Sequence, residues 1–129
     1  MAAERESMLI MKNVSKTFNP GTVNEKCALN GVNLTLGAGD FVTIVGSNGA
    51  GKSTLIKCIS GLLRFQGHIE ICGADNKSLE AKRALGYVPE MPAIYDMLTV
   101  GEHLEFIRRA YRLSDGKEYE EELLERFEL

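Results

Sequence analysis

The pattern of apolar and polar positions divides the chain into a strand-rich first part and a helical last part. Short apolar runs bounded by turn residues predict β-strands at residues 8–14, 32–36, 41–45, 67–72 and 85–88. Within 32–36, every second residue is apolar, which predicts one buried and one solvent-facing side. Residues 15–26 are expected to form a loop, and 41–45 is expected to run antiparallel to 32–36.

Helical spacing appears in four places. A helix is expected to begin near Lys52 and to end at Gly61 in a left-handed conformation. Ser78 is placed to cap a short helix that runs to Ala84. Thr99 and Glu102 have the spacing of a capping box, and a last helix is expected around residues 119–127. The fold class is therefore α/β, with a mixed sheet and one phosphate-binding helix up to Pro89, followed by a helical region.

The segment between the predicted strand 41–45 and the helix carries the clearest chemistry. Its sequence, GSNGAGKS over residues 46–53, fits the phosphate-loop pattern of two glycines five apart followed by Lys and Ser. Consecutive backbone N–H groups can converge on a phosphate only where few side chains intervene, and the helix N-terminus adds further donors. The candidate nucleotide-binding residues are Gly46, Ser47, Asn48, Gly49, Ala50, Gly51, Lys52, Ser53 and Thr54.

Three side chains in this segment have expected roles. Lys52 would reach the β- and γ-phosphates, Ser53 would offer a hydroxyl to Mg²⁺, and Thr54 would lie on the α-phosphate side. The alternative is a glycine-rich turn that binds nothing. At average residue usage, the four fixed positions coincide by chance in roughly one chain of this length in a few hundred, which disfavours that alternative.

Composition excludes several classes of protein. The chain has 129 residues, of which 44% are hydrophobic and 26% are charged, as in ordinary globular domains. Its net charge of −3 gives no basic footprint for nucleic acid, so no nucleic-acid partner is expected. No apolar run is long enough to span a membrane and the N-terminus is not a secretory signal, so a cytoplasmic location is expected. Three widely spaced cysteines, Cys27, Cys58 and Cys72, are expected to be buried or half-buried thiols.

The order of these motifs resembles the nucleotide-binding domain of ABC transporters over residues 8–129. Residues 12–18, KNVSKTF, look like that family's first strand and A-loop, with Phe18 at the place of the aromatic residue that stacks on adenine. Residues 46–54 are similar to its Walker A motif, and residues 86–90, GYVPE, place Glu90 at the Q-loop. Residues 87–106 look like bacterial exporter-type ATPases, and residues 98–104 resemble the entry into the helical subdomain.

The resemblance implies a P-loop NTPase of ABC type that binds ATP and Mg²⁺, with Ser53 and Glu90 as the metal-contacting residues. It also implies partners, namely transmembrane transporter subunits and a second nucleotide-binding domain, and a location at the inner membrane through those subunits. Residues 8–89 would form the sheet and phosphate-loop core, and residues 90–129 the Q-loop and the start of the helical subdomain. The family couples ATP binding and hydrolysis to solute transport, here export.

The family's signature, Walker B and switch-histidine motifs have no counterpart in this sequence. The chain is therefore expected to be the N-terminal portion of one incomplete domain, and to bind ATP without turnover. A second hypothesis is a non-catalytic nucleotide-binding module that competes for transporter subunits. A third, a small P-loop kinase, is disfavoured because no lid or acceptor-site pattern is visible.

Overall fold

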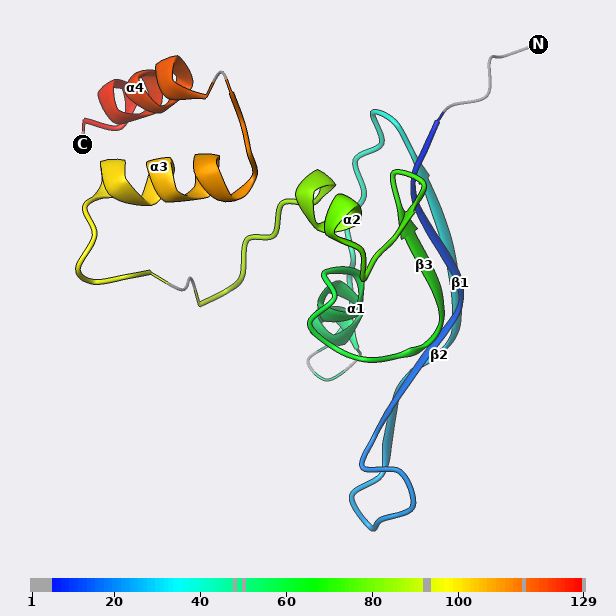
Figure 1. Ribbon diagram of the computed structural model, residues 1–129. Coiled ribbons are helices and arrows are strands. Elements are labelled where there is room, and N and C mark those ends of the chain that lie inside the picture. The colour runs from blue at the N-terminus through cyan, green and yellow to red at the C-terminus, as the bar shows by residue number, and fades with distance from the viewer. Residues whose placement is uncertain (1–5, 48, 50, 92–93, 115, 129) are drawn as a thin grey trace. The chain divides into compact units, whose positions relative to one another are not determined.

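The computed structural model describes residues 6–47, 49, 51–91, 94–114 and 116–128, and Figure 1 shows its elements. By internal packing the chain divides into two compact units, Met1–Tyr87 and Val88–Leu129, and each is described by itself. The first unit contains the strands and two short helices. The second contains two further helices.

The first unit is built on an antiparallel sheet with the strand order β2-β1-β3-β4. Its strands are β1 (Ser7–Phe18), β2 (Lys26–Gly37), β3 (Gln66–Ile71) and β4 (Ala74–Asp75). The predicted alternation over residues 32–36 is confirmed, because Val32, Leu34 and Leu36 are half-buried whereas the residues between them are exposed. Val32 and Leu34 pair with Val14 and Met11 of β1.

The prediction of a loop over residues 15–26 is wrong at both ends. β1 continues to Phe18 and β2 begins at Lys26, so the turn between them covers only residues 19–25. Pairing of Lys16 with Leu29 and of Phe18 with Lys26 extends the ladder into residues that have no apolar periodicity. Backbone pairing, which the side-chain pattern does not report, therefore decides where these strands end.

Two predicted strands are absent from the structure. Residues 41–45 have no regular secondary structure, and Phe41 and Val45 are 92% and 91% exposed. The predicted partner of this segment, residues 32–36, pairs with β1 instead. Residues 85–88 also form no strand, and Val88 is fully in solvent. An apolar run becomes a strand only where a neighbouring strand satisfies its backbone groups, and the described residues offer these two segments none.

Helices α1 (Lys52–Ile59) and α2 (Leu79–Ala84) lie on the same face of the sheet (Figure 1). The predicted end of α1 is confirmed, since Gly61 has a φ of +79° and its N–H donates to the Cys58 carbonyl. The predicted cap of α2 is also confirmed, because Ser78 Oγ accepts from the Ala81 N–H. The core between helices and sheet consists of Met11, Val14, Leu29, Cys58, Ile69, Ile71 and Ala81.

Asn76 is the one polar side chain among the buried residues described. It is 2% exposed, and its side-chain N–H groups donate to the carbonyls of Cys58, at 2.9 Å, and Ile59, at 3.5 Å. These carbonyls belong to the last turn of α1, where a helix lacks intrahelical donors. Asn76 therefore links the end of α1 to the segment that leads into α2.

The second unit consists of α3 (Val100–Ala110) and α4 (Lys117–Arg126), which run in opposite directions (Figure 1). The predicted capping box is present, because Thr99 Oγ1 accepts from the Glu102 N–H and Glu102 Oε1 accepts from the Thr99 N–H. Arg108 Nε of α3 donates to Glu120 Oε1 of α4 at 2.6 Å. This ion pair joins the two helices.

The segment before α3 is held by His103. Its Nε2 lies 3.0 Å from the Tyr95 backbone N–H, and its Nδ1 lies 2.8 Å from the Thr99 carbonyl. Because the Tyr95 N–H can only donate, Nε2 must accept, and the ring proton of the neutral imidazole belongs on Nδ1, where it donates to Thr99. The Tyr95 ring stacks on the imidazole, with a centroid separation of 6.2 Å. Across the described stretches of both units, no helix is long and apolar enough to cross a bilayer.

Candidate phosphate-binding site

The phosphate loop lies directly against strand β2. Gly51, the residue that precedes α1, has a φ of +98°, and a Cβ built on it would lie 2.7 Å from the Ala28 carbonyl oxygen. Only glycine fits both the left-handed conformation and this approach. The Gly51 carbonyl accepts from the Leu55 N–H at 2.9 Å, so the helix begins directly at the loop. The loop is thereby positioned by the sheet as well as by the helix.

The N-terminus of α1 is suited to an anion. No side chain caps its first N–H groups and its first turn contains no acidic residue. These N–H groups carry the positive end of the helix dipole, and a phosphate oxygen can accept from them. The Lys52 ammonium group donates to the Gly46 carbonyl, so the lysine side chain folds back over the loop.

A cavity of about 170 Å³ lies between the phosphate loop and the sheet. Its lining residues are Phe18, Lys26, Ala28, Gly49, Gly51, Lys52, Ser53 and Thr54. The sequence predicts Phe18 as a base-stacking residue, and Phe18 lines this cavity. It lies at least 28 positions before the loop in the chain, and the antiparallel β1–β2 pairing brings it there. Ser53 is exposed to solvent and Thr54 is half-buried.

The remaining candidate residues are distributed differently. Gly46 and Ser47 are exposed and do not line the cavity. Asn48 and Ala50 lie outside the described residues. Glu90 is exposed and belongs to the second unit, which is described separately from the one that holds the cavity. Over the described ranges, His, Cys, Asp and Glu side chains form no group of three that could hold a metal ion.

Strand β2 contributes two lining residues that the sequence analysis did not identify, Lys26 and Ala28. Lys26 falls at the end of the expected loop 15–26, and Ala28 falls in no element that the pattern predicts. The pairing of β1 with β2 is the feature that identifies these two residues. Once Phe18 is placed at the end of β1, its partner across an antiparallel pair is Lys26.

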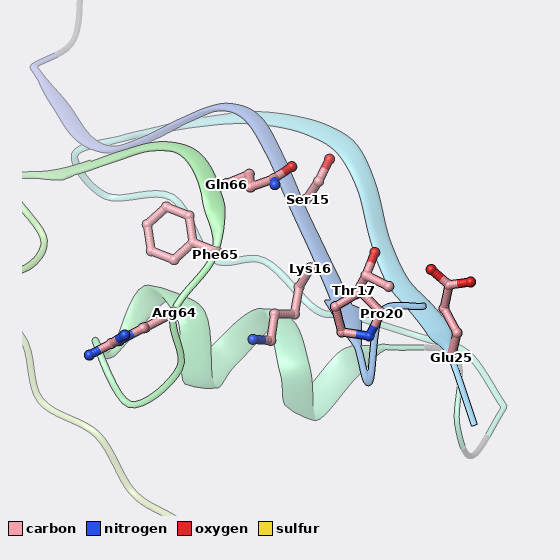
Figure 2. A pocket seen from close by; sticks show the side chains of 8 residues that line it. All are labelled: Ser15, Lys16, Thr17, Pro20, Glu25, Arg64, Phe65 and Gln66. Atoms are coloured by element: carbon pink, nitrogen blue, oxygen red, sulfur yellow. The ribbon is translucent and has the colours of Figure 1, made fainter. Parts of the chain in front are cut away.

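A second and larger cavity, of about 340 Å³, lies beside the end of β1. Figure 2 shows its lining, with Ser15, Lys16 and Thr17 from β1, Arg64 and Phe65 from the segment that leads into β3, and Gln66 from the start of β3. The Lys16 ammonium group lies 5.2 Å from the centroid of the Phe18 ring. Lys16 thus packs against the aromatic ring that also lines the phosphate-loop cavity.

The cysteines differ from one another in exposure. Cys58 is buried in the core, whereas Cys27 and Cys72 are exposed, contrary to the expectation that all three are at least half-buried. Cys27 and Cys72 lie in or beside strands whose outer side faces solvent. Burial raises the pKa of the Cys58 thiol, and the positive charge of Lys16 partly offsets that rise.

Comparison with known proteins places this site in a family. The family model described as ABC transporter matches residues 29–129. An ABC transporter ATP-binding protein from Methanosarcina acetivorans is 41% identical over 124 residues, which cover 93% of this chain and 43% of the relative. The SkfA peptide export ATP-binding protein SkfE of Bacillus subtilis is 30% identical over 105 residues, covering 81% of this chain and 42% of the relative.

A relative named for choline transport matches a similar share of the chain. The choline transport ATP-binding protein OpuBA of Bacillus subtilis is 32% identical over 123 residues, which cover 91% of this chain and 31% of the relative. Among solved structures, the crystal structure of a cobalt transport ATP-binding protein has a TM-score of 0.59 and 30% identity, and covers 83% of this chain and 40% of that one. This confirms the α/β fold of an ABC-type P-loop NTPase.

The chain spans less than half the length of these relatives. The matched part includes the phosphate loop, the whole of α1 and both helices of the second unit. The ordered motifs, the shared fold and the family match agree, and the chain belongs to the ABC transporter family of ATP-binding proteins.

Proposed function

We propose that this chain is the nucleotide-binding portion of an ABC transporter ATPase and that it binds MgATP in the cavity between β2 and the phosphate loop. The observation that carries the proposal is the shared lining of that cavity. Phe18 offers a ring face for adenine, and Lys52, Ser53 and Thr54 offer phosphate and metal contacts at the other end.

The donor set at the loop fits a nucleoside triphosphate. The uncapped N–H groups of α1 and the Lys52 ammonium group supply positive charge to the phosphates. The Ser53 hydroxyl, exposed at the cavity, is an oxygen donor of the kind that Mg²⁺ prefers when it also binds phosphate. When bound, Mg²⁺ would neutralise phosphate charge there. Glu90, at the position that resembles the Q-loop, is proposed as a further metal-contacting residue.

The wider role follows from family membership. We assign ATP binding to the sheet-containing part, residues 8–89, and contact with transmembrane subunits to the helical part, residues 90–129. Dimerisation with a second nucleotide-binding domain and a cytoplasmic position at the membrane belong to the same proposal. We further propose that the direction of transport is export. It is supported by the peptide-export relative, while a phosphonates import protein and a choline transport protein also match, so a transport assay decides the direction.

Equilibrium titration with a fluorescent ATP analogue in the presence of Mg²⁺ tests nucleotide binding. Lys52→Ala should weaken binding at least tenfold, because a hydrogen bond to a charged group contributes roughly 1.5–3 kcal/mol. Lys57→Ala is the matched control, since Lys57 lies in the last turn of the same helix and does not line the cavity. Equal affinity of Lys52→Ala and Lys57→Ala would refute the proposed site.

A further inference from the structure

The first residues of β2 lie close to the phosphate loop, although the Walker A pattern contains no residue of this strand. The Ala28 carbonyl lies against Gly51, as described above. Two residues earlier, the Lys26 ammonium group lies so near the loop that a Cβ built on Gly49 would be 3.5 Å from Lys26 Nζ. Lys26 therefore extends from the strand to the middle of the loop.

The position of Lys26 is set by the sheet. Lys26 and Phe18 are Cα partners in the antiparallel β1–β2 ladder, and both side chains line the same cavity. Directly opposed residues of an antiparallel pair have Cβ atoms about 4.5–5.5 Å apart. The Lys26 side chain therefore lines the same cavity as the proposed base-stacking ring, with its ammonium group near Gly49 of the phosphate loop.

The charged side chains that line the cavity are all positive. The cavity lining includes two lysines, Lys26 and Lys52, and no carboxylate. Lys52 donates to the Gly46 carbonyl, whereas in the part of the chain that the structure describes no ion pair involves Lys26. Lys26 is exposed, so its ammonium group can move to a ligand without leaving a buried partner.

We propose that Lys26 is a second phosphate-binding cation of this site, one that the phosphate-loop motif does not contain. This inference rests on the proposed nucleotide site. Because Lys26 stands beside the ring that would hold the base, it contacts the phosphates nearest the nucleoside, which ATP and ADP share. Lys52, at the start of α1, serves the terminal phosphates. The two lysines thus bind opposite ends of the phosphate chain.

Titration of the full 129-residue chain with ATP, ADP and adenosine tests this role. Lys26→Ala should weaken ATP and ADP binding by a similar factor of about five, the upper end for an exposed ion pair, and leave adenosine binding unchanged. Lys26→Arg should restore most of the affinity, because it keeps the charge. Lys12→Ala is the control, since Lys12 is an exposed lysine of β1 that does not line the cavity.

The outcomes separate the two proposals. If Lys52→Ala loses ATP binding but Lys26→Ala behaves like Lys12→Ala with both nucleotides, the role of Lys26 is refuted and the nucleotide site stands. If Lys26→Ala weakens adenosine as much as ADP, the lysine supports the fold of the cavity and the inference is also wrong. If Lys52→Ala leaves ATP affinity unchanged, the proposed function fails, and the role of Lys26 fails with it.

Discussion

The side-chain amide of Asn76 donates to the Cys58 carbonyl at 2.9 Å. A residue 18 positions later in the chain therefore supplies a hydrogen-bond donor to the last turn of α1. We predict that Asn76→Ala lowers the free energy of unfolding by about 1–2 kcal/mol, because a buried hydrogen bond is lost. Urea denaturation followed by circular dichroism measures the change. Asn24→Ala, at an exposed turn position, is the control and should have little effect.

A methyl group at Gly51 should disrupt the phosphate loop. Gly51→Ala adds a Cβ 2.7 Å from the Ala28 carbonyl oxygen, in addition to the cost of a left-handed φ, which is about 1–2 kcal/mol. Gly39→Ala separates these effects, because Gly39 has a φ of +81° but no atom within 4 Å of an added Cβ. We expect Gly51→Ala to be the more destabilised and to lose binding of the ATP analogue. Equal stability of the two variants would show that the loop can move away from β2.

The capping box of α3 should make that helix sensitive to acid. The pKa of Glu102 is lowered chiefly by the hydrogen bond that the Thr99 backbone N–H donates to its carboxylate, and further by a hydrogen bond from the Thr99 side chain. Since the folded-state pKa lies below the unfolded one, the stabilisation is present above the unfolded pKa and is lost as pH falls through the folded pKa. Carboxyl NMR titration measures this pKa directly. In Thr99→Ala the Glu102 pKa should rise only part of the way toward its ordinary value, because alanine removes the hydroxyl but keeps the backbone N–H that donates to the carboxylate.

The ion pair between Arg108 and Glu120 should hold the helical hairpin together. Glu120→Gln is expected to lower the stability of the α3–α4 unit by about 1.5 kcal/mol, because a hydrogen bond between charged groups is weakened at side chains that are only 22% and 16% exposed. Glu122→Gln is the control, since its pair with Arg126 is mostly in solvent. Hydrogen exchange of the α3 and α4 amides reports the difference. Similar exchange rates in both variants would contradict it.

The helices could be predicted from the sequence because their signals are local. Thr99 and Glu102, Ser78, and Gly61 each mark a helix end through bonds to residues within a few positions. The phosphate loop is local for the same reason. Its glycines and Lys52 lie within one eight-residue segment, 46–53, so the motif is visible without knowing which strand it contacts.

The strands were harder to predict because their partners are distant. Residues 41–45 and 85–88 are as apolar as real strands, but apolar character does not provide a ladder. Conversely, polar residues such as Lys16 and Lys26 belong to strands because β1 and β2 pair along their whole length. The same long-range pairing brings Lys26 and Phe18 to the loop, so three of the eight lining residues, Phe18, Lys26 and Ala28, could not be read from the motif alone.

The burial of Cys58 makes the packing of α1 measurable by thiol chemistry. A cysteine reagent should modify Cys27 and Cys72 rapidly, and Cys58 only when α1 separates from the sheet, since its thiol is enclosed by the core. The slow modification, counted by mass spectrometry, then gives the free energy of this local opening. A nucleotide bound at the N-terminus of α1 would stabilise the closed state and slow the reaction in proportion to its occupancy. Cys58 thus reports, from the far end of the helix, whether the phosphate loop is filled.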